Sequence, residues 1–123
     1  MGKNSFSKSG GVVRLFKAFK YSMHGFANAL KNEAAFRQDC MLVAAALISL
    51  IFFDVSQTGF CLVLGASALL LITELLNSAI EETVNICAPE FHPLAKRAKD
   101  MGSAAVFCAL VNLVAIWVIV TLL

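Results

Sequence analysis

Hydrophobic positions divide the chain into three apolar runs separated by short polar segments. The runs cover 40–53, 60–73 and 101–123, and none of them contains Asp, Glu, Lys or Arg. About 20 helical residues are needed to cross the roughly 30 Å hydrocarbon core of a bilayer. The third run is long enough, and the first two reach that length only by extending inward past charged residues. We therefore predict three membrane helices, over 34–53, 60–86 and 101–123.

Residues 12–31 follow a different pattern, in which apolar positions recur at spacings of three and four. The apolar face is Val12, Phe16, Phe19, Met23, Phe26 and Leu30. Basic and polar side chains occupy the opposite face. This pattern predicts an amphipathic helix that lies along the inner membrane surface. Residues 1–11 are polar, small and basic, which predicts a loose tail, so the whole chain, 1–123, reads as a single membrane domain.

Composition and charge agree with a multi-pass membrane protein. Hydrophobic residues make up 59% of the chain and charged residues 15%, whereas soluble domains are nearer half apolar and a quarter charged. All ten Lys and Arg residues precede the first run or lie between the second and third. The positive-inside rule then predicts a cytoplasmic N-terminus and a periplasmic C-terminus.

The inner half of the second predicted span carries carboxylates. Glu74, Ser78, Glu81 and Asn85 recur at spacings of four, three and four, which sets them on one helix face. Asn77 and Glu82 flank that face. An ionisable group near the bilayer interior costs about 2.5–3.5 kcal/mol, so such a group indicates a functional site. The alternative is that Glu74 only pairs with Arg37 and fixes assembly.

The carboxylates lie at two different depths in the predicted membrane, which suggests that they have different roles. Glu74 and Glu81 differ by about 10 Å along a helix, which is too far for one metal ion to bridge easily. Glu33, at the inner start of the first span, lies at a depth similar to that of Glu81, and those two could hold Mg²⁺. Lys99 and Asp100 follow in the second cytoplasmic loop, where Lys99 suits a phosphate.

Soluble-kinase motifs are absent from the sequence, which has no GxxxxGK[ST], HRD or DFG. Phosphate chemistry would therefore rest on a metal ion, basic side chains and carboxylates, because phosphoryl transfer mainly needs positioning and charge neutralisation. No nucleic-acid partner is expected. A different class of protein, a small oligomeric transporter or channel, remains an alternative. Against it, ionisable residues do not continue outward through the spans, as a relay across the membrane would need.

Three motifs resemble the bacterial integral-membrane diacylglycerol kinase family: "NEAAFRQD" (32–39), "ELLNSAIEETVN" (74–85) and "RAKDMGSAAV" (97–106). The match runs in order from about Arg14 to the C-terminus. The resemblance implies a homotrimer of three-span subunits, each with a surface helix, and active sites shared between subunits. It also implies MgATP-dependent phosphorylation of diacylglycerol to phosphatidic acid at the cytoplasmic face of the bacterial inner membrane. A related activity on undecaprenol remains an alternative.

The resemblance also implies residue roles. Glu74 corresponds to the general base, and Glu33 and Glu81 to the metal ligands. The residues that contact ATP are Arg14, Tyr21, Glu33, Glu81, Glu90, His92, Lys99 and Asp100. The residues that line the lipid side or support the site are Ala18, Arg37, Gln38, Asn77 and Ser103.

Three positions depart from the family pattern. Asn85 stands where an Asp is frequent, which puts an acidic role there in doubt. Phe91 stands where a Tyr is common, and Met23 replaces a Trp of the surface helix.

Overall fold

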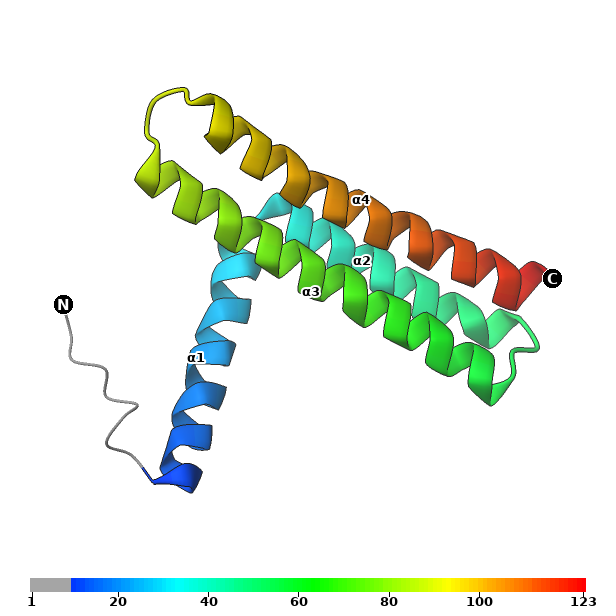
Figure 1. The fold of residues 1–123 in the computed structure, drawn as a ribbon. Coiled ribbons are helices and arrows are strands. Elements are labelled where there is room, and N and C mark those ends of the chain that lie inside the picture. The colour runs from blue at the N-terminus through cyan, green and yellow to red at the C-terminus, as the bar shows by residue number, and fades with distance from the viewer. Residues whose placement is uncertain (1–9) are drawn as a thin grey trace.

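The computed structural model describes residues 10–123, and these residues are all-helical (Figure 1). The elements in chain order are α1 (Gly11–Asn32), α2 (Ala34–Ser49), the short 3-10 helix η2 (Leu50–Phe52), α3 (Gln57–Cys87) and α4 (Pro93–Leu122). Three of these segments are long and apolar enough to cross a membrane, namely α2 with η2, α3 and α4. The all-α prediction with three such helices is confirmed. The predicted tail lies outside the described residues except for its last two positions, and Gly11 begins α1.

Helices α2, α3 and α4 lie side by side, while α1 leaves this bundle at a steep angle (Figure 1). The change of direction occurs at Glu33, whose extended backbone (φ −112°, ψ 105°) separates α1 from α2. Arg37 stabilises the joint, because its Nη1 donates to the carbonyl oxygens of Leu30 at 2.9 Å and Lys31 at 3.1 Å. These carbonyls belong to the last turn of α1, where a helix lacks its own donors.

The connections between the bundle helices are short and capped by side chains. Ser56 precedes α3, and its hydroxyl oxygen accepts from the backbone N–H of Gly59 at 3.0 Å. His92 precedes α4 in the same way, and its Nδ1 accepts from the N–H of Leu94 at 3.1 Å. Pro93 occupies the first helical position, where its missing N–H has no cost. Both helices therefore begin earlier than the predicted spans at 60 and 101.

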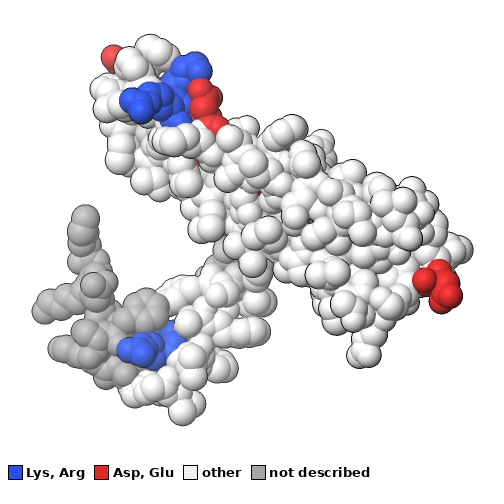
Figure 2. Space-filling view, turned by 45° about the vertical axis from the view of Figure 1, so that its right-hand side comes forward, with Lys and Arg blue, Asp and Glu red and all other residues white. Residues whose placement is uncertain are grey.

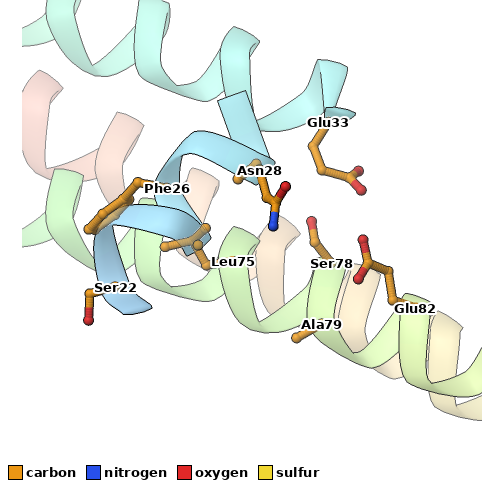
Figure 3. Close-up of a pocket in the computed structure, with 10 residues that line it drawn as sticks. Ser22, Phe26, Asn28, Glu33, Leu75, Ser78, Ala79 and Glu82 are labelled. Atoms are coloured by element: carbon orange, nitrogen blue, oxygen red, sulfur yellow. The ribbon is translucent and has the colours of Figure 1, made fainter. Parts of the chain in front are cut away.

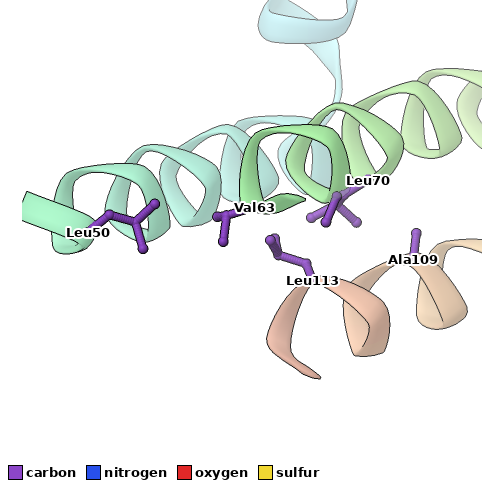
Figure 4. Packing of buried hydrophobic residues seen from close by; sticks show 6 residues of the cluster. Leu50, Val63, Leu70, Ala109 and Leu113 are labelled. Atoms are coloured by element: carbon purple, nitrogen blue, oxygen red, sulfur yellow. The ribbon is translucent and has the colours of Figure 1, made fainter. Parts of the chain in front are cut away.

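The bundle core is a small apolar cluster that α3 shares with its two neighbours (Figure 4). Its members are Leu50, Val63, Ala66, Leu70, Ala109 and Leu113. Val63 and Leu70 are both 0% exposed, and their separation of seven residues keeps them on one face of α3. Because α3 packs against both α2 and α4, its later residues on this face also lie between helices.

A polar contact joins α2 and α4 at the end of the bundle far from α1. The indole Nε1 of Trp117 donates to Ser49 Oγ at 2.9 Å. The Trp117 ring also meets Phe53 edge to face, with ring centroids 5.6 Å apart. Interhelical hydrogen bonds of this kind help to hold helices together in lipid.

Charged side chains are distributed unevenly over the surface. In Figure 2 the blue Lys and Arg atoms gather near the α3–α4 connection and on α1, whereas the middle of the bundle is white. The α2–α3 connection contains no Lys or Arg, and its one charged residue is Asp54. The bundle thus has one basic end and a charge-poor middle.

Candidate functional site

The buried face of α3 turns polar in its second half. Glu74 is 4% exposed, and Asn77 and Ser78 are 8% exposed each. From Glu74 the face divides into two rows, each with members four residues apart. One row is Asn77 and Glu81, and the other is Ser78 and Glu82. This arrangement differs from the predicted single stripe, since Asn77 is buried whereas Asn85 is exposed.

A second carboxyl group lies beside Glu74. Asp39 of α2 interacts directly with the Glu74 side chain, and its Oδ2 is buried without a hydrogen-bond partner. Glu33 and Glu81 also lie close enough to Glu74 for electrostatic interaction. The alternative that Glu74 pairs with Arg37 is not supported, because Arg37 binds carbonyls of α1. The sequence signal for Asp39 is its position as an acid inside a predicted membrane span.

A pocket of about 410 Å³ opens between α1, the Glu33 joint and α3 (Figure 3). Glu33, Ser78 and Glu82 contribute its polar groups on one side, together with Asn28 of α1. Phe26, Leu75 and Ala79 form part of its apolar wall. The pocket therefore combines carboxylates with apolar surface, and Leu75, the residue after Glu74, is part of its wall.

Asn77, the first residue of its row, faces α4. Asn77 Nδ2 donates to Glu81 Oε1 at 3.4 Å, which is a long contact. Asn77 Oδ1 is buried without a hydrogen-bond partner and lies against Gly102 of α4. Only a residue without a side chain allows α4 to approach Asn77 this closely.

A second pocket, of about 320 Å³, lies at the α3–α4 connection. Among its lining residues are four that were predicted to contact ATP: Glu90, His92, Lys99 and Asp100. Lys96 also lines it and forms an ion pair with Asp100, with Nζ and Oδ2 2.6 Å apart. Both partners are well exposed, so this pair contributes little to stability. The structure brings these four predicted residues together in one place.

The remaining predicted residues lie outside both pockets. Arg14, Ala18 and Tyr21 are on the part of α1 that projects from the bundle, and Gln38 and Ser103 are exposed. The two pockets share no lining residue. Within residues 10–123, no group of three or more His, Cys, Asp or Glu side chains is arranged to hold a metal ion. A metal ion bound here would rest on a pair of carboxylates with other oxygen donors.

Comparisons of the chain with a family model and with individual proteins point to the same family. The family model described as prokaryotic diacylglycerol kinase matches residues 20–121. The diacylglycerol kinase of Pseudomonas aeruginosa is 43% identical over 122 residues, which cover 99% of each chain. That of Escherichia coli K12 is 43% identical over 109 residues, covering 89% of each chain. That of Haemophilus influenzae is 45% identical over 112 residues, covering 89% of this chain and 93% of its own. The chain therefore belongs to the prokaryotic diacylglycerol kinase family.

Proposed function

We propose that this protein transfers the γ-phosphoryl group of ATP to diacylglycerol and forms phosphatidic acid at the cytoplasmic face of a bacterial inner membrane. The observation that carries the proposal is the buried carboxylate of Glu74 in an otherwise apolar membrane helix, beside a pocket with further carboxylates. Membership of a family whose relatives are named diacylglycerol kinases supports the substrate.

Distances along α3 support a division between a lipid end and a nucleotide end. If α3 enters the hydrocarbon at Gln57, Glu74 lies about 26 Å along the helix and so inside the roughly 30 Å core. Glu81 lies about 36 Å along it, beyond the core. Glu74 can therefore meet a hydroxyl that stays with the lipid, while Glu81 faces an aqueous nucleotide.

The basic end of the bundle is the cytoplasmic one in this proposal. Lys96, Arg97 and Lys99 all lie at the start of α4, and the opposite connection has no basic residue. The positive-inside rule then gives a cytoplasmic N-terminus and a periplasmic C-terminus. This orientation exposes the second pocket to cytoplasmic ATP.

Glu74 acts as the general base. Its carboxylate accepts the proton of the free lipid hydroxyl, the hydroxyl oxygen attacks the γ-phosphorus, and the bond to the bridging oxygen of ADP breaks. A low-polarity site strengthens such electrostatic effects, since water does not screen them. Asn77 and Ser103 support the lipid side from α3 and α4.

Two carboxylates and a basic side chain suit the nucleotide. Glu33 and Glu81 would hold Mg²⁺, which prefers one or two carboxylates together with water and phosphate oxygens. When bound, Mg²⁺ offsets the negative charge of the phosphate groups. Lys99 supplies a further positive charge from the second pocket, which Glu90, His92 and Asp100 also line, and these three residues would contact the nucleotide. Release of Asp100 from its exposed ion pair with Lys96 has a small cost.

The remaining proposed site residues lie on α1 and at the start of α2. Arg14 and Tyr21 contact the nucleotide, whereas Ala18 contacts the lipid substrate. Arg37 and Gln38, at the start of α2, support the site, and Arg37 does so by fixing the angle between α1 and α2.

The active protein is a homotrimer with active sites shared between subunits. Two features support this assembly. The predicted residues divide between two separate pockets in one chain, and α2 and α4 leave most of their surface uncovered by their own chain. Helix α1 lies on the inner membrane surface, because its apolar residues Val12, Phe16 and Phe19 are exposed and need lipid.

A phosphorylation assay tests the function. Purified protein in mixed micelles is given γ-labelled ATP with diacylglycerol or with undecaprenol, and labelled lipid is quantified. We expect labelled phosphatidic acid that depends on Mg²⁺ and a much lower yield with undecaprenol. Preferential labelling of undecaprenol would identify the other lipid kinase, and no labelling of either lipid by folded protein would reject the proposal.

A further inference from the structure

Lys96 is a cation of the second pocket that has no contact with the nucleotide in the proposed function. Its Nζ lies 2.6 Å from Asp100 Oδ2, and both residues line the pocket at the α3–α4 connection. Glu90 and Lys99 also line it. Without Lys96 the pocket would carry two carboxylates and one ammonium group, an excess of negative charge that disfavours a nucleotide. Lys96 balances these charges.

The packing of α3 against α4 gives the depth of the pocket lysines relative to Glu74. The two helices run side by side in opposite directions (Figure 1), and Gly102 of α4 lies against Asn77 of α3. Glu74 precedes Asn77 by three residues, toward the α2–α3 end. Lys99 precedes Gly102 by three residues, toward the α3–α4 end. At about 1.5 Å per residue, Lys99 lies about 9 Å from the level of Glu74, and Lys96 about 14 Å from it.

This order of depths fits a nucleotide that lies with its phosphate chain along the start of α4. In the proposed reaction the γ-phosphate meets the lipid hydroxyl at Glu74, so it is the deepest of the phosphate groups. Lys99 is the pocket lysine nearer to that level. Lys96 lies three residues further out, and Cβ atoms three residues apart on a helix are about 5–6 Å from each other. The two ammonium groups can therefore reach different phosphate groups of one nucleotide.

We propose that Lys96 binds the α- and β-phosphate groups of the nucleotide, which stay with ADP, and exchanges Asp100 for them when the nucleotide binds. Both Lys96 and Asp100 are well exposed, so opening their ion pair has a small cost. An ammonium group with three rotatable donors suits phosphate oxygens. The released carboxylate of Asp100 can then accept hydrogen bonds from the nucleotide. This inference rests on the proposed function, which supplies ATP as the phosphoryl donor, and it adds Lys96 to the residues that bind ATP.

Nucleotide binding by the full-length protein tests the role of Lys96 without catalysis. Purified protein in detergent is dialysed to equilibrium against labelled ATP or labelled ADP, with Mg²⁺ and without lipid substrate. We expect Lys96→Met to raise the dissociation constants of ATP and ADP alike, about three- to thirtyfold, because it removes a charge-assisted contact to phosphate groups that both nucleotides contain. Lys96→Arg should restore most of the affinity, since it keeps the positive charge.

The matched control is Arg97→Met, which removes one positive charge from the same turn of α4 but outside the pocket lining. It should leave both dissociation constants unchanged. Unchanged or tighter binding by Lys96→Met, a loss confined to ATP, or an equal loss in Arg97→Met would each overturn the inference. The kinase assay separates this outcome from the proposed function. Labelled phosphatidic acid with Lys96-independent nucleotide binding rejects only the role of Lys96, and Lys96-dependent nucleotide binding without lipid phosphorylation rejects only the lipid kinase.

Discussion

Replacement of Gly102 by Ala should separate α3 from α4 at the site. A Cβ at this position would collide with Asn77 Oδ1 and lie 3.3 Å from Asn77 Cγ. Asn77 is 8% exposed, so its side chain cannot swing out into solvent to make room. The helices must move apart, and overpacking of this kind costs about 1–3 kcal/mol. The same shift disturbs the contact between Asn77 and Glu81.

Gly65 provides the control, because a Cβ there meets nothing within 4 Å. Both substitutions gain about 1 kcal/mol from the better helix propensity of Ala, so their difference isolates the packing cost. Unfolding by sodium dodecyl sulfate in mixed micelles can be followed by the fluorescence of the single tryptophan. We expect Gly102→Ala to be about 1–3 kcal/mol less stable than Gly65→Ala, and to turn over more slowly. Equal stability of the two variants would refute the close approach of α4 to Asn77.

Three further predictions concern single residues. Arg37→Ala removes both hydrogen bonds that Nη1 donates to the end of α1, so hydrogen exchange of the last turn of α1 should rise, and unchanged protection would contradict the role of Arg37 at the joint. Ser49→Ala keeps the tryptophan but removes the acceptor of its Nε1 hydrogen bond, and should cost about 0.6–1.7 kcal/mol in the same unfolding assay; a loss equal to zero would exclude a stabilising bond. Lys99→Ala should raise the KM for ATP far more than the KM for diacylglycerol. Steady-state kinetics with each substrate varied would measure both constants, and a larger rise in the KM for diacylglycerol would contradict the nucleotide-binding role of Lys99.

Hydropathy was sufficient to predict the three bundle helices, because the chain has three uncharged apolar runs and each of the two shorter ones can be extended inward to the length that crosses lipid. The helix starts were harder to predict. Pro93 lies before the predicted span at 101, yet it begins α4, since proline is well suited to the first turn. Capping by Ser56 likewise starts α3 before the predicted span at 60. Local capping chemistry decided both boundaries.

The candidate site was only partly predictable. Helical spacing correctly predicts polar residues near Glu74 on α3. It does not predict which of the two rows, Asn77 with Glu81 or Ser78 with Glu82, lies against which neighbouring helix. That depends on the packing of α4, where Gly102 admits Asn77, whose amide nitrogen donates to Glu81. Spacing alone predicted that Glu82 would flank the main polar face. In the structure Glu82 lines the pocket with Glu33. Residues distant in sequence are brought together by helix packing that periodicity does not encode.

The most direct measurement of the central claim is the turnover of Glu74→Gln with diacylglycerol and MgATP. Glutamine retains the shape of the side chain and cannot accept the proton, so we expect kcat to fall by about 10²- to 10⁴-fold. Folding, checked by circular dichroism, and ATP binding should persist, because Glu74 lies about 10 Å deeper along α3 than Glu81. A folded, ATP-binding Glu74→Gln protein with near-normal turnover would contradict the assignment of this buried carboxylate as the base.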